Sequence, residues 1–77
     1  MFIQEEIRKR IANILEIPVL DLDVNAEMNE ISEWDSMRNV MILADIENYY
    51  DVIIPEDDIF DLVSVASIAA EVEKLKG

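Results

Sequence analysis

The sequence predicts an all-α fold, a small bundle of three longer helices and one short helix. Three segments carry apolar residues at helical spacing. Each of these segments begins with acidic or hydroxyl side chains suited to a helix N-terminus. The one run that resembles a strand, residues 51–55, has no second strand to pair with, so we expect an extended loop there. The chain of 77 residues is sufficient for one domain, residues 1–77, with a thin core.

The first helix is predicted over residues 2–17. Its apolar stripe consists of Ile3, Ile7, Ile11, Ile14 and Leu15. Acidic residues at its start and the basic residues 8–10 after them match the helix dipole. Pro18 should end this helix, because the residue before a proline is pushed out of helical geometry.

Residues 17–35 have no sustained periodicity and are predicted to form a long loop with room for a short helical turn. Six apolar side chains should anchor this loop to the core: Leu20, Leu22, Val24, Met28, Ile31 and Trp34. Oxygen ligands at 21, 23 and 25 resemble the start of a calcium-binding loop. However, Ala26 and Ser32 stand where that loop needs glycine and a bidentate glutamate, so no metal site is predicted.

The second helix is predicted from Asp35 or Ser36 to about Tyr50, with Asp35 as the N-cap. It has two apolar faces. One face, assigned to the core, contains Ile42, Leu43, Ile46 and Tyr50; the other contains Met37, Val40, Met41 and Ala44, with Glu47 beside it. A small domain can hardly bury both, so the second face is expected to be a partly exposed contact surface. The alternative is that this face packs under the long loop.

After the extended loop, residues 56–62 are predicted to form the short capped helix, with Ile59, Phe60 and Leu62 behind an acidic front. Ser64 should cap the last helix. The apolar stripe of that helix consists of Val65, Ile68, Ala69, Val72 and Leu75.

The composition narrows the function classes. Eighteen acidic and six basic residues give a net charge of −12, and the chain contains neither cysteine nor histidine. Such a surface repels nucleic acid and anionic lipid, and the usual ligands of zinc and the usual thiol nucleophile are missing. No run of about 20 apolar residues could span a membrane. The N-terminus lacks the basic-then-apolar order of a signal peptide, so a cytoplasmic location is expected. The chain is also expected to be a monomer.

The hydroxyl of Ser36 is a candidate functional group. It follows an aspartate at a predicted helix N-terminus, where free N–H groups favour a negatively charged substituent. No residue suited to activating its hydroxyl is evident. A serine that carries a phosphodiester would be stabilised there, whereas a serine that only helps to cap the helix is the simpler alternative.

Residues 34–59, WDSMRNVMILADIENYYDVIIPEDDI, resemble the acyl carrier protein family, and the resemblance extends over essentially the whole chain. The positions that match are Asp35, Ser36, Val40, Ile46, Glu47, Tyr50, Ile54 and Pro55. The resemblance implies a non-catalytic carrier. A separate phosphopantetheinyl transferase would supply the base and magnesium and attach 4′-phosphopantetheine from coenzyme A to Ser36, with Asp35 assisting. The thiol of that arm would then carry acyl groups as thioesters.

The resemblance also implies where partners and cargo would bind. The partner surface would be Met37, Val40, Met41, Ala44 and Glu47. An acyl chain sheltered inside the bundle would contact Ile42, Ile46, Ile54, Ile59 and Leu62, which would otherwise be ordinary core residues.

Some positions differ from those of carriers in housekeeping fatty acid synthesis. Met37 replaces the usual leucine, Arg38 is basic, and Met41 and Asn48 replace acids. These differences predict a specialised pathway, with an acyl- or aminoacyl-loading ligase and enzymes with basic and apolar docking patches as partners. An aminoacyl, D-alanyl or peptidyl carrier is the alternative within the class. An unmodified acidic interaction module is the alternative outside it.

Overall fold

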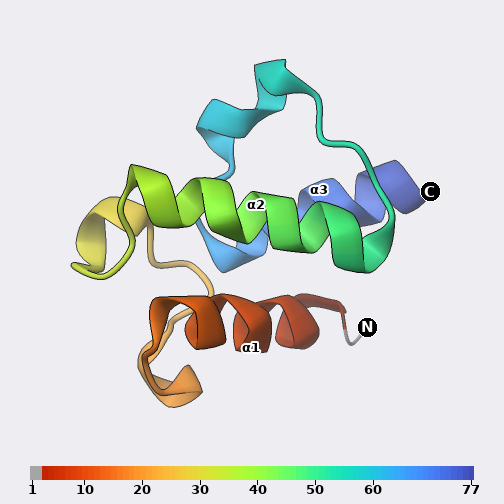
Figure 1. Cartoon of the computed structure of the whole chain (residues 1–77). Coiled ribbons are helices and arrows are strands. Elements are labelled where there is room, and N and C mark those ends of the chain that lie inside the picture. Colours follow the sequence, from red (N-terminus) through yellow and green to blue (C-terminus); the bar gives the residue numbers. More distant parts are fainter. Residues whose placement is uncertain (1–2) are drawn as a thin grey trace.

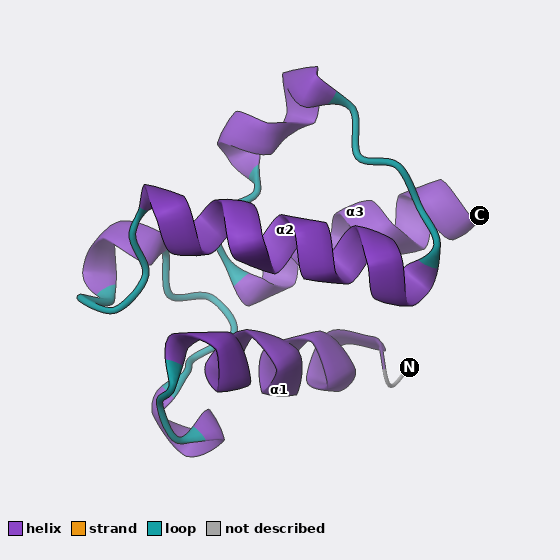
Figure 2. Ribbon diagram, viewed as in Figure 1, coloured by secondary structure: helices purple, strands orange, loops and turns teal. Residues whose placement is uncertain are grey.

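The computed structural model describes residues 3–77, and all regular structure in that range is helical (Figure 2). In chain order the elements are α1 (Ile3–Leu15), η1 (Val19–Asp21), η2 (Met28–Glu30), α2 (Ser36–Tyr50), η3 (Glu56–Asp61) and α3 (Val65–Lys76). The three α-helices are the predicted longer helices. The short helix η3 and the turns η1 and η2 are 3₁₀ helices. The all-α bundle is therefore confirmed; the predicted start of the first helix at Phe2 lies outside the described residues.

The three α-helices enclose the core (Figure 1). α1 runs antiparallel to α2 and α3 and packs against both of them, and η3 stands at the opposite side of α2 from α1. The fully buried large side chains come from all three helices and from Leu22 of the long loop: Ile7, Ile11, Leu15, Leu22, Ile42, Ile46, Ile68, Val65 and Val72. The predicted core faces of the three helices are thus confirmed.

The helix ends follow local rules that place the site. The Asp35 carboxylate accepts a hydrogen bond from the Arg38 backbone N–H at 2.8 Å, and Ser64 caps α3 in the same way through Ser67 N–H. α1 ends at Leu15, two residues earlier than predicted. Glu16 adopts a left-handed conformation (φ 60°), and Ile17 N–H donates to the Ala12 carbonyl, which satisfies the end of the helix before Pro18 is reached.

Two predicted core contacts are wrong. Leu20 is 85% exposed and Phe60 is 88% exposed. Both lie within 3₁₀ segments, where residues three apart share a face. Ile59 and Leu62 therefore point inward together while Phe60 points to solvent. In the first turn, Val19 and Leu22 pack inward and Leu20 does not. The predicted side-chain cap of the short helix is also wrong, because η3 begins after Pro55 without a side-chain hydrogen bond.

Few acidic side chains have a cationic partner. Within residues 3–77, ion pairs involve only Glu5, Asp45, Asp58 and Glu71 among the eighteen acids of the chain. The remaining acids repel one another on a small surface.

We expect 0.5 M sodium chloride to raise the Tm by about 4 °C, equivalent to about 1 kcal/mol for a domain of this size, because salt screens this repulsion. Differential scanning calorimetry across a salt series tests this expectation, and a flat Tm would show that the charges do not limit stability.

Candidate functional site

Ser36 is the first residue of α2, and its side chain is exposed. The Asp35 carboxylate accepts a hydrogen bond from the Arg38 backbone N–H, and the Asp35 carbonyl accepts one from the Asn39 N–H at 2.9 Å. The side chain of Arg38 turns back and donates to the Glu33 carbonyl at 2.9 Å. These contacts fix the residues on both sides of Ser36 and leave its hydroxyl accessible at the positive end of the helix dipole.

Trp34 and Asn39 hold the loop before Ser36 against the core. Trp34 is 2% exposed, and its indole Nε1–H donates to the Asn39 side-chain oxygen at 2.9 Å. The Asn39 Nδ2 group donates to the Leu62 carbonyl at 3.4 Å. One buried amide therefore links the loop, α2 and the end of η3.

Asn39 is a buried site residue that the apolar stripes of the sequence do not predict. It sits three residues before Ile42 and four before Leu43, on the core face of α2, and so continues the buried stripe of that helix. The available signal was a polar residue on that stripe, five positions after a tryptophan whose N–H needs an acceptor.

A mostly apolar groove of about 220 Å³ opens beside Ser36. Its walls come from η2, α2, η3 and the segment that leads to α3. The lining residues are Met28, Ser36, Asn39, Val40, Ile59, Phe60 and Val63. An exposed hydroxyl at a helix N-terminus, next to an apolar groove, can anchor an anionic group that has an apolar extension.

The sequence model of the phosphopantetheine attachment site family matches residues 5–72. The chain belongs to this family. A comparison with curated proteins finds no match. Members of the family carry 4′-phosphopantetheine as a covalently attached prosthetic group, so the chain is a phosphopantetheine carrier.

The residues around Ser36 fit this prosthetic group. The helix N-terminus suits its phosphodiester, and the neighbouring groove presents Val40, Ile59 and Phe60 to an apolar substituent. When bound, the group supplies the thiol that the cysteine-free chain lacks.

The predicted contact face of the carrier is exposed as expected. The exposed fractions of Met37, Val40 and Met41 are 74%, 67% and 51%, and Ala44 is also exposed. The alternative in which the loop covers this face is wrong. Glu47 differs from the others, because it is half-buried and its carboxylate accepts from Ile54 N–H at 2.8 Å. Glu47 therefore holds the loop after α2 in place.

The five predicted acyl-contacting residues are not brought together at the groove. Only Ile59 lines it. The other four lie deeper in the bundle as packed core: Ile42, Ile46, Ile54 and Leu62. A chain bound in the groove would therefore touch Ile59 first and would reach the others only after the packing rearranged.

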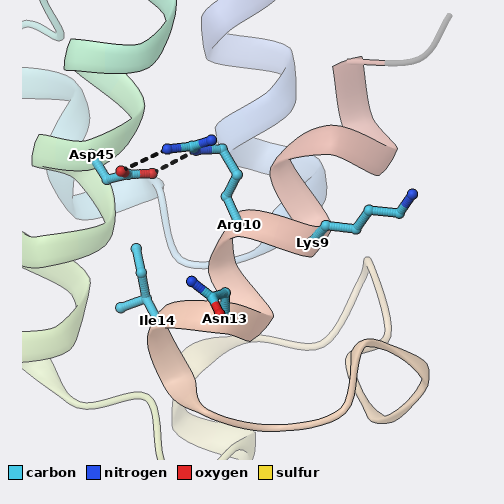
Figure 3. Close-up of a pocket in the computed structure, with 5 residues that line it drawn as sticks. All are labelled: Lys9, Arg10, Asn13, Ile14 and Asp45. Atoms are coloured by element: carbon cyan, nitrogen blue, oxygen red, sulfur yellow. Dashed lines mark hydrogen bonds and ion pairs between the residues drawn. The ribbon is translucent and has the colours of Figure 1, made fainter.

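A second hollow lies between α1 and α2, roughly two turns or more along α2 from Ser36 (Figure 3). The Arg10 guanidinium binds the Asp45 carboxylate through two hydrogen bonds of 2.8 and 2.9 Å and lies 3.9 Å from the centre of the Tyr49 ring. The hydrogen bond to Asp45 raises the pKa of Arg10. In Figure 3 the Lys9 side chain points away from this pair. The cluster joins two helices and is remote from Ser36.

Across residues 3–77, no three side chains of histidine, cysteine, aspartate or glutamate are grouped so that they could hold a metal ion. None of the described helices is both long and apolar enough to cross a membrane.

Proposed function

We propose that the chain is a carrier domain, over residues 1–77, that bears acyl groups as thioesters on a phosphopantetheine arm attached to Ser36. The observation that carries the proposal is the exposed Ser36 hydroxyl at the N-terminus of α2, beside the apolar groove. It would act as a monomer in the cytoplasm and catalyse no reaction of its own. A separate transferase would modify it.

Ser36 needs external activation in this proposal. The chain has no histidine or cysteine, and the carboxylate of the preceding residue, Asp35, already accepts a hydrogen bond from the Arg38 N–H. The Ser36 oxygen would form a new bond to the phosphorus atom next to the pantetheine in coenzyme A, the pyrophosphate bond would break, and adenosine 3′,5′-bisphosphate would leave. The proton of Ser36 would pass to a base of the transferase. Asp35 would assist by holding the first turn of α2 in a fixed conformation and by offering its free oxygen to the partner.

The exposed face of Met37, Val40, Met41 and Ala44 is the proposed docking surface for the transferase, for a loading ligase and for the pathway enzymes. Basic residues on these partners would complement the acidic chain, and apolar residues would cover the two methionines. The apolar rather than acidic character of this face supports a specialised pathway over housekeeping fatty acid synthesis. The sequence Asp35-Ser36-Met37 supports an aminoacyl or D-alanyl carrier as the second candidate.

Intact-mass measurement tests the attachment. After incubation with coenzyme A, magnesium and a broad-specificity phosphopantetheinyl transferase, the chain should gain the mass of one phosphopantetheine. The Ser36→Ala variant should gain nothing. Ser32→Ala, which removes an exposed hydroxyl from the loop before α2, should be modified as the parent is.

Two results would contradict the attachment proposal. A mass gain that persists in Ser36→Ala would place the arm elsewhere. No gain with several transferases would favour an unmodified interaction module that uses the exposed face of α2. Loading assays with acyl-coenzyme A and with amino acids plus ATP and candidate ligases then separate the acyl carrier from the aminoacyl carrier.

A further inference from the structure

We infer that Asn39 closes the route from the groove beside Ser36 into the core, so that this carrier holds short acyl groups in the groove and does not bury long alkyl chains in its bundle. This inference rests on the proposed function, because it concerns the cargo of an arm on Ser36. It assigns to Asn39 a role in cargo specificity.

The route into the core runs along one face of α2. Ser36 and Asn39 line the groove. The next residues on that face are Ile42 and Leu43, which are 0% and 6% exposed and do not line it. A chain that enters from the Ser36 end must therefore pass Asn39 before it meets the apolar core.

Asn39 bridges both sides of this route. Its oxygen accepts from Trp34 on the loop side, and its Nδ2 group donates to the Leu62 carbonyl at the end of η3. The side chains of Asn39 and Trp34 are both buried. An alkyl chain that displaced the amide would leave an indole N–H, a carboxamide and a carbonyl without partners in apolar surroundings, which is strongly unfavourable.

The groove itself has room for a small group. Its volume of about 220 Å³ compares with about 150 Å³ for an engineered apolar cavity that binds benzene. Val40, Ile59 and Phe60 provide apolar walls, and the Asn39 amide forms the inner limit. These dimensions suit a short linear or branched acyl group and leave a longer chain with its end in solvent.

A chain-length series on the wild-type protein tests the inference directly. The transferase would load the arm from acetyl-, butyryl-, octanoyl- and dodecanoyl-coenzyme A, and intact mass would verify each product. We expect butyryl to raise the Tm by about 2–4 °C over the acetyl form and longer chains to add nothing. Methyl NMR shifts should change at Ile59 and stay constant at Ile42, Ile46 and Ile54.

A variant pair adds an independent measurement. Asn39→Val should open the route, so that octanoyl raises the Tm further than butyryl and shifts the Ile42 methyl signals. Asn48→Val makes the same substitution on the exposed side of α2 and should behave as the wild type. Because the wild-type series needs no variant, a poorly folded Asn39→Val protein does not prevent the test.

The outcomes are distinct. If octanoyl or dodecanoyl raises the Tm of the wild type above the butyryl form, or shifts Ile42 and Ile46, the inference is overturned while the carrier function stands. If no coenzyme A derivative adds mass at Ser36, the proposed function fails and the inference fails with it. Equal Tm values for all four acyl forms would also overturn the role of the groove.

Discussion

Replacing Trp34 with alanine is expected to lower the free energy of unfolding by about 3–5 kcal/mol. Trp34 is 2% exposed, and its N–H satisfies the buried Asn39 oxygen. The substitution would leave both a cavity and an unpaired amide. A chain of 77 residues has a total stability of roughly 4–12 kcal/mol, so this variant should be close to unfolding. Urea denaturation followed by far-ultraviolet circular dichroism measures the change without relying on the fluorescence of the chain's single tryptophan.

Two further variants identify why Trp34→Ala should lower the free energy of unfolding. Trp34→Phe retains most of the buried ring and removes the N–H, so it should cost less than the alanine variant, about 1–2 kcal/mol. Phe60→Ala removes an aromatic ring that is 88% exposed and should change stability by less than about 0.5 kcal/mol. A loss below about 1 kcal/mol in Trp34→Ala would mean that the loop before Ser36 does not depend on the indole for its position.

Replacing Glu71 with glutamine is expected to raise stability at pH 7 by about 1–3 kcal/mol. Glu71 is 7% exposed, and its Oε2 atom is buried without a hydrogen-bond partner among residues 3–77. Asp58 from η3 and Lys74 from α3 are the charged groups that face it; Lys74 lies 3.7 Å from both carboxylates. Glutamine would fill the same space without a buried charge and could donate to Asp58.

The stability that Glu71→Gln gains over the wild type is expected to depend on pH. The hydrogen bond with Asp58, followed by burial, raises the pKa of Glu71 above its ordinary value of 4.5. The folded state therefore binds the proton more tightly than the unfolded state does. Its stability should fall as the pH rises from about 4.5 through the raised pKa. The advantage of Glu71→Gln should accordingly shrink toward zero near pH 4.5.

A matched substitution on the same helix separates this local effect from the loss of one negative charge. Glu73 is exposed on α3, so Glu73→Gln makes the same chemical change at the surface. Urea unfolding at a series of pH values should show a large, pH-dependent gain for Glu71→Gln and a small gain for Glu73→Gln. Equal gains would mean that the overall acidity of the chain, and not the buried carboxylate, is responsible.

The helical framework could be predicted because its determinants are local. The apolar stripes of α1, α2 and α3 have the period of an α-helix, and the caps at Asp35 and Ser64 are adjacent to the segments they start. The same period places Met37, Val40 and Met41 together on the outside of α2. The attachment residue could be proposed for the same reason, since it depends on one helix N-terminus.

The features that could not be predicted depend on shorter periods or on distant contacts. Apolar character alone predicts that Leu20 and Phe60 point inward, but the three-residue period of 3₁₀ segments turns them outward. Asn39 and Glu71 are buried polar residues that face groups on other elements, the Leu62 carbonyl and the Asp58 carboxylate. The groove arises where four segments meet, so no single stretch of sequence encodes it.

Val40 belongs to two surfaces at once. It is 67% exposed on the outer face of α2, and it also forms a wall of the groove beside Ser36. A partner that covers this residue would change the environment of whatever the groove contains, and the contents of the groove would change the affinity of the partner. Thermodynamic linkage requires the two effects to be equal in magnitude. The carrier would thus signal its loading state to its partners through one shared side chain, without a change of fold.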